Sequence, residues 1–287
     1  PKSLSHAFAQ SECSFLLGAS FLALFSTALI STRLKMFLAL FGTKVSFRSC
    51  LTATMCGLSL NLILPARGGD MVKMTYLRRG GKPSWEILAG AALLERGFDV
   101  LALGLIGLIA SIALGLRDTA ITAGIVFIIA AAGLLLLPRM GSLPIVGNKV
   151  RNFSTIVKKT SQRKLRLLGC FCTCCLCWTA NSMIMGLLLK AFDDTISLTH
   201  AFAVTPPSIL VGIVPVSLWG VGTRDGALAF FLQGVTAPEN AISAGFLYTA
   251  LVYWLLGLIG LPALLLARRK TKTITDDSAK SNALGSS

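Results

Sequence analysis

The sequence has few charged residues for its length. Of its 287 residues only 14% are charged, whereas 54% are hydrophobic, and the mean hydropathy is +0.74. A soluble globular chain carries about 25% charged residues, so this shortage excludes a soluble globular protein. The apolar residues form continuous runs rather than alternating ones, which excludes a transmembrane β-barrel.

Histidine is also scarce, because only His6 and His200 are present. The sequence contains no GxSxG, P-loop or HExxH pattern, so we expect that the chain is not an enzyme. Five of its eight cysteines lie in CFCTCCLC, residues 170–177, inside an apolar run without histidine. We interpret them as small packing residues, and we expect no metal and no other cofactor.

Long apolar runs dominate the rest of the chain, and several approach the roughly 20 residues that span a bilayer. They cover residues 15–30, 100–116, 121–137, 167–189 and 241–267. These runs predict an all-α polytopic membrane protein, a helical bundle within one transmembrane domain at residues 1–267.

Basic residues outnumber acidic ones, 27 to 12, and they lie in short loops. The loop 138–166 contains eight Lys or Arg and no acid, which is typical of a cytoplasmic loop. Residues 31–49, with Arg33 and Lys35, belong on the same side. The tail 268–287 begins with RRK and is expected to be disordered and cytoplasmic. These charges favour contact with anionic lipid in the cytoplasmic membrane over nucleic acid.

Two further apolar stretches, 50–64 and 200–216, do not fit as simple spans. Each must begin and end on the same side for the charge pattern to hold, so we predict two re-entrant elements that enter from opposite faces. Oppositely oriented, broken elements in the halves 14–116 and 166–267 are typical of an inverted-repeat transporter.

The breaks in these two stretches are similar to each other. ILPARGGD (63–70) and IVPVSLWGVGTRDG (213–226) both contain an aliphatic residue, Pro, glycines, Arg and Asp. Pro ends helical hydrogen bonding and Gly permits a tight reversal. The helix-breaking residues are then Pro65, Gly68, Gly69, Pro215, Gly220 and Gly222.

Several charges lie close to or inside apolar segments. A charge at the bilayer centre costs roughly 2.5–3.5 kcal/mol, so each needs a partner or water. They are Arg67, Asp70, Glu95, Arg96, Asp99, Arg224 and Asp225. Arg could bind a phosphate through its planar fork, with an acid orienting it; alternatively, salt bridges could hold helices together. For Glu95, Arg96 and Asp99 both interpretations stand, and for Arg67 and Arg224 we favour binding. Asn181 is expected to form an interhelical hydrogen bond.

Three ordered motifs resemble the lysylphosphatidylglycerol synthase transmembrane region, or flippase-like, family. They are NLILPARGGDMVK (61–73), LLERGFD (93–99) and VPVSLWGVGTRDGAL (214–228), and the resemblance extends from about residue 15 to 267. Two features depart from the family pattern. Asp225 stands where Glu is usual, and a first transmembrane helix is lacking, as expected of a fragment or a shortened member.

The resemblance implies translocation of a lipid, either an anionic or aminoacylated phospholipid or a lipid-linked glycan. It adds Asn61 and Ser217 to the headgroup-binding positions. No synthase domain is present, so lipid aminoacylation is not implied. The expected partners are membrane phospholipids and a lipid-modifying enzyme or glycosyltransferase.

Two alternatives remain open. The chain could be a non-catalytic membrane subunit that supports a glycosyltransferase or lipid synthase. It could also be an ion-coupled secondary carrier that uses Asp70 and Asp225 as coupling sites.

Overall fold

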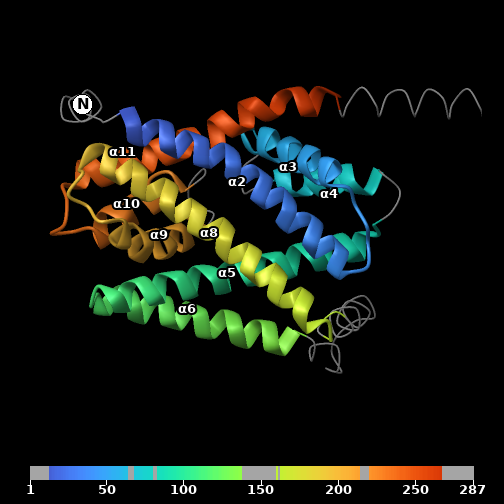
Figure 1. The fold of residues 1–287 in the computed structure, drawn as a ribbon, viewed down its shortest axis with the longest axis horizontal. Coiled ribbons are helices and arrows are strands. Elements are labelled where there is room, and N and C mark those ends of the chain that lie inside the picture. Colours follow the sequence, from blue (N-terminus) through green and yellow to red (C-terminus); the bar gives the residue numbers. More distant parts are fainter. Residues whose placement is uncertain are drawn as a thin grey trace, which may run out of the picture.

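A computed structural model of the chain describes residues 13–63, 68–79, 83–137, 160, 162–213 and 220–266. Within these ranges every regular element is a helix, as the all-α prediction requires (Figure 1). Most of the predicted basic loop 138–166 and the whole tail 268–287 lie outside the described residues.

Five helices among the described residues are long and apolar enough to cross a membrane. They are α2 (Cys13–Leu40), α5 (Trp85–Ala113), α6 (Arg117–Leu136), α8 (Lys164–Phe192) and the helix that begins as α11 (Pro238–Thr249), continues as the π-helical η3 (Ala250–Leu255) and ends at residue 266. Figure 1 shows them running back and forth between two ends of the molecule, with α2 and α8 side by side. The multi-pass prediction is confirmed.

Two of these helices are longer than their apolar runs. The first run was expected to end at residue 30, but α2 continues to Leu40, so Arg33 lies in a helix and not in a 31–49 loop. The second was expected to begin at residue 100, but α5 begins at Trp85, so Glu95 and Asp99 lie in its interior. These charges do not end the helices because they pair with one another inside the bundle.

Two hairpins of shorter helices complete the fold. The first consists of α3 (Phe47–Asn61) and α4 (Gly69–Arg79), and the second of α9 (Leu198–Ile213) and α10 (Thr223–Phe231). At about 1.5 Å per residue these helices are roughly 13–24 Å long, shorter than the ~30 Å apolar core of a bilayer. In Figure 1 α3 and α9 begin at opposite ends of the molecule, and α4 and α10 run back beside them.

Local sequence fixes where these short helices begin. Ser46 caps α3 by accepting a hydrogen bond from the Ser49 amide, a common N-cap arrangement. Gly220 and Gly222 have φ angles of 81° and 88°, which side chains disfavour, and α10 begins at the next residue, Thr223. The chain can therefore reverse sharply just before α10.

Each hairpin packs against the long helix that follows the hairpin of the other half. Ser59 of α3 donates a hydrogen bond to the Gly257 carbonyl oxygen at 2.9 Å. A Cβ on Gly260 would lie 2.6 Å from the Met55 carbonyl oxygen. In the other half, a Cβ on Gly107 of α5 would lie 3.3 Å from the Pro206 ring in α9. Glycine at these positions lets the helices approach closely.

These glycines lie in identical hexapeptides. LGLIGL occurs at residues 103–108 in α5 and again at residues 256–261, near the end of the last long helix. Both copies therefore follow a short hairpin and occupy the second long helix of their half. The halves share the order long helix, short hairpin, long helix.

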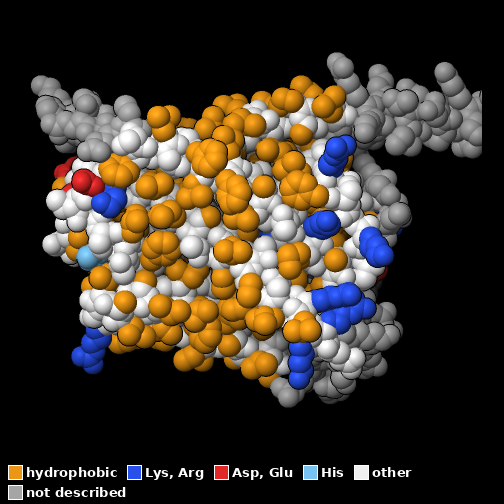
Figure 2. Space-filling model, in the orientation of Figure 1, with side chains coloured by type: hydrophobic (Ala, Val, Ile, Leu, Met, Phe, Trp, Pro, Cys, Tyr) orange, Lys and Arg blue, Asp and Glu red, His pale blue; other side chains and the backbone are white. Residues whose placement is uncertain are grey.

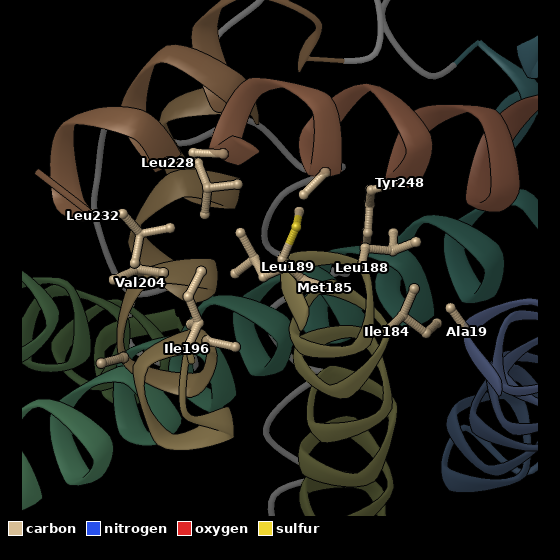
Figure 3. Packing of buried hydrophobic residues seen from close by; sticks show 14 of the residues in the cluster. Ala19, Ile184, Met185, Leu188, Leu189, Ile196, Val204, Leu228, Leu232 and Tyr248 are labelled. Carbon is tan, nitrogen blue, oxygen red and sulfur yellow. The ribbon is translucent and has the colours of Figure 1, made fainter. Parts of the chain in front are cut away.

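Hydrophobic and basic side chains occupy different parts of the visible surface. Figure 2 shows hydrophobic side chains across the middle of the visible face, with Lys and Arg gathered toward one end. That end contains the exposed residues Lys35, Lys44, Arg48, Arg163, Lys164 and Arg166. Figure 3 shows the packed interior of the second half, where Leu228 of α10 and Val204 of α9 face Met185 and Leu189 of α8.

Substituting Gly260 with Ala should destabilise the protein by about 1–3 kcal/mol, the usual cost of overpacking. The new methyl group would meet the Met55 backbone, which cannot move aside as a flexible side chain can. Thermal unfolding in detergent measures this effect. Gly133→Ala is the matched control, since a Cβ there has nothing within 4 Å, and it should be neutral or slightly stabilising. Equal melting temperatures for the two variants would contradict the packing.

Candidate functional site

The interior of α5 carries three charged residues within little more than one turn. Glu95 and Asp99 are four residues apart, so they lie on the same face of the helix, and both are buried at 2% and 3% exposure. Arg96 lies beside them and donates to Asp99 at 3.3 Å. Two buried carboxylates on an apolar helix require cations from neighbouring elements.

The first cation comes from α2. Arg33 donates from Nη1 to Asp99 and from Nη2 to Glu95, each at 2.6 Å, and the residue is only 5% exposed. Its guanidinium therefore bridges the two carboxylates. Trp178 of α8 adds a hydrogen bond from its indole N–H to Asp99 at 2.9 Å. The arrangement fixes α2 and α8 against α5.

The second contribution comes from α4. Asp70 lies 2.7 Å from Arg96 and 3.4 Å from Lys73, while Lys73 also lies 3.9 Å from Glu95. We refer to the resulting set as the charged network, and it consists of Arg33, Asp70, Lys73, Glu95, Arg96 and Asp99. It contains three cations and three anions, so its formal charge is zero.

The charged network is buried on one side and accessible on the other. The side chains of Arg33, Lys73, Glu95 and Asp99 are all less than 10% exposed, whereas those of Asp70 and Arg96 are 32% and 38% exposed. The Asp70–Arg96 pair therefore forms an edge that a ligand can reach. Both residues have charged side-chain atoms that can form hydrogen bonds to a polar or ionic ligand.

The turn between α3 and α4 positions Asp70 at this edge. Asn61, the last residue of α3, accepts a hydrogen bond from the Gly69 amide at 2.8 Å. Gly69 is packed against the Gly57 backbone, where a side chain would not fit. Asp70 follows directly in the first turn of α4, where the helix dipole favours a negative charge.

The second breakpoint produces a different arrangement around Arg224. The Arg224 Nη2 atom donates to Asp225 Oδ1 at 2.5 Å, to the Gly245 carbonyl oxygen at 2.6 Å and to Thr249 Oγ1 at 2.8 Å. Arg224 and Asp225 are 2% and 3% exposed. In this structure the Arg224 guanidinium thus binds groups of the protein itself and joins α10 to α11.

Aromatic and amide side chains extend this second group. The Arg224 guanidinium carbon lies 4.8 Å from the Tyr248 ring centroid, a cation–π distance. The Tyr248 hydroxyl donates to Asn181 of α8 at 2.6 Å, so Asn181 does form an interhelical hydrogen bond. We refer to this group as the Arg224 cluster, and it consists of Asn181, Arg224, Asp225, Gly245, Tyr248 and Thr249.

The structure brings together four of the predicted site residues, Asp70, Glu95, Arg96 and Asp99, and places Arg224 and Asp225 in a separate group. Asn61 and Gly69 close the first hairpin, and Gly68 lies in the turn before α4. The predicted residues Pro65, Arg67, Pro215 and Ser217 lie outside the described residues.

Sequence reasoning missed Arg33, Lys73 and Trp178 as members of the site. The charge pattern alone predicts a cytoplasmic loop around Arg33 because other basic residues follow it. Its position three residues beyond an apolar run could have indicated a buried cation, since the chain stays apolar from Met36 to Phe41. Lys73 was overlooked although it follows Asp70 by three residues, a spacing that brings side chains together on a helix.

The described residues do not form a metal centre. In the part of the chain that the structure describes, no three His, Cys, Asp or Glu side chains are arranged to hold a metal ion. Cys170, Cys174 and Cys177 are buried on one face of α8, and the cysteines described there form no disulfide. The chemistry that the charged network supports is ionic recognition.

Comparison with known proteins identifies a family. Residues 1–260 match the family described as the lysylphosphatidylglycerol synthase TM region. A search of curated proteins found no match.

Replacing Arg33 with Met should destabilise the protein by about 3–5 kcal/mol, because it leaves Glu95 and Asp99 short of a buried partner. Thermal or denaturant unfolding in detergent would measure the loss. Lys35→Met, a change of the same kind at an exposed position on α2, should alter stability by less than about 1 kcal/mol. Similar effects of the two substitutions would show that Arg33 does not hold the network together.

Proposed function

We propose, since the chain belongs to the lysylphosphatidylglycerol synthase TM region family, that it moves phospholipids between the leaflets of the cytoplasmic membrane. The headgroup would pass along the charged network while the acyl chains remain in the lipid. The observation that carries this proposal is the exposed edge formed by Asp70 and Arg96 on an otherwise buried set of charges.

We further propose that the two hairpins are re-entrant and that the halves form an inverted repeat. Three features support this: the short helices of both hairpins, their start at opposite ends of the molecule (Figure 1), and the LGLIGL hexapeptide in the second long helix of each half. Broken elements of opposite orientation place the binding site of many transporters near the bilayer midplane. The basic end would face the cytoplasm.

The charge of the network favours one kind of headgroup. A phosphate could bind the Arg96 guanidinium in a bidentate manner, and a headgroup amine could pair with Asp70. An anionic headgroup without an amine would add negative charge to a network that is neutral. A headgroup that carries both groups can pair its phosphate with Arg96 and an amine with Asp70, so an aminoacylated phospholipid suits this edge better than phosphatidylglycerol.

Translocation in proteoliposomes tests this function. Fluorescent phosphatidylglycerol and its lysyl ester, both labelled on an acyl chain, would be compared for the wild type, Arg96→Gln and Arg48→Gln. Loss of the charge-assisted bonds of Arg96 should slow translocation at least about tenfold. Arg48→Gln, at an exposed position of α3, should behave as the wild type does. The lysyl ester should be moved faster than phosphatidylglycerol.

Different outcomes would favour the alternatives. If neither lipid moves above the rate in empty liposomes while the purified protein retains a glycosyltransferase or lipid synthase, a supporting subunit becomes the better interpretation. Alternatively, liposomes could take up a soluble solute at a rate that depends on pH or Na⁺. If Asp70→Asn abolishes that uptake, an ion-coupled carrier becomes the better interpretation. If the Arg96 and Arg48 variants lose lipid movement equally, the proposed edge is wrong.

A further inference from the structure

The two halves differ in how firmly the hairpin is attached to the following long helix. In the first half the shortest contact is the Asp70–Arg96 pair, whose side chains are about one third exposed. A longer contact of 3.9 Å joins the buried side chains of Lys73 and Glu95. In the second half the contact is made by Arg224 and Asp225, whose side chains are 3% and 5% exposed. The first hairpin is therefore open to its surroundings at this contact, and the second is closed.

The buried contact of Arg224 and Asp225 with α11 depends on two glycines that leave room for these side chains. Gly245 of α11 has no side chain where the Asp225 carboxylate lies, and a Cβ there would overlap Asp225 Oδ1. On the other side, a Cβ on Gly212 of α9 would lie 2.8 Å from Arg224 Cβ. Arg224 is thus enclosed between α9 and α11, and its bonds to the Gly245 carbonyl and the Thr249 hydroxyl hold α10 in place.

The long helix changes its hydrogen-bonding pattern directly after this contact. Thr249 is the last residue of α11, and the π-helical segment η3 begins at Ala250. π-helical turns occur mostly as single insertions in α-helices and frequently at functional sites. The contact with Arg224 therefore lies at the point where the last long helix departs from α-helical geometry.

We propose that the contacts of Arg224 and Asp225 with α11 form a latch, which must open for lipid to pass the second hairpin. The latch holds α10 against α11 in the structure described, and its release exposes the second hairpin while the Asp70–Arg96 edge of the first closes. This inference rests on the proposed function, because halves related as inverted repeats are expected to exchange open and closed forms. It assigns Arg224 to a conformational step rather than to the headgroup.

A reversible disulfide tests the latch. A Cβ on Gly245 would lie 3.2 Å from Asp225 Cβ, close to the separation of roughly 3.5–4.5 Å that disulfides usually require. Asp225→Cys/Gly245→Cys, in a variant whose eight native cysteines are replaced by Ser or Ala, would join α10 to α11 on oxidation. The oxidised protein should translocate the lysyl ester of phosphatidylglycerol at least about tenfold more slowly than the reduced protein, and reduction should restore the rate.

The controls are the two single-cysteine variants, whose rates should not respond to oxidant or reductant. Equal rates for the oxidised and reduced double variant, with the disulfide confirmed by mass spectrometry, would overturn the latch. Failure of the proposed function would look different, because the wild type and the reduced double variant would then move no lipid.

Hydrogen exchange in nanodiscs provides a test that does not depend on transport. Thr249→Val removes the hydroxyl that accepts from Arg224 while keeping the shape of the side chain. Amides of α10 should then exchange about tenfold faster, as expected for the loss of one hydrogen bond to a charged group, while amides of α4 should exchange no faster than in the wild type. Thr75→Val, which removes an exposed hydroxyl of α4, is the matched control. Unchanged exchange of α10 in Thr249→Val would also overturn the latch.

Discussion

The fold depends on the pairing of charges that lie within membrane-crossing helices. Arg33, Glu95 and Asp99 each belong to a long apolar helix, and none could remain there alone without a cost of several kcal/mol. Because Arg33 comes from α2 and the two carboxylates come from α5, the ion pairs fix how far along each other these helices lie and which of their faces are in contact. Trp178 brings α8 to the same point. Apolar packing brings helices together, but the charges select which faces meet.

The second constraint is the close approach of backbones around each hairpin. Gly57 and Gly69 let α4 fold back along α3, and Gly212 lets α10 fold back along α9. In each hairpin the two helices approach most closely at glycine. Packing between such small residues is a common source of helix association in membranes. Because glycines leave room where the helices of each hairpin meet, charged residues such as Asp70 and Arg224 fit at the beginnings of α4 and α10.

The membrane helices could be predicted because apolar runs of this length are rare outside a bilayer, and the motif residues Asp70, Glu95, Arg96 and Asp99 could be singled out as charges close to apolar segments. The ends of α2 and α5 could not be predicted, because a hydropathy pattern ends an apolar span at charges such as Arg33 and Glu95 when their partners lie far away in the chain. The contacts of Arg224 could not be predicted either, because its partners Gly245 and Thr249 carry no charge and give no signal in the sequence. The two LGLIGL hexapeptides are visible in the sequence, but only the fold shows that each lies in the long helix that follows a short hairpin.

The packing of each hairpin against the opposite half has a consequence for how the chain assembles. The first hairpin is covered by Gly257 and Gly260, and the second by the region around Gly107. During synthesis the first hairpin is therefore made long before the helix that covers it, and it stays uncovered until nearly the whole chain has been made. A half-length chain would leave its hairpin uncovered and would need a second copy to supply the missing helix.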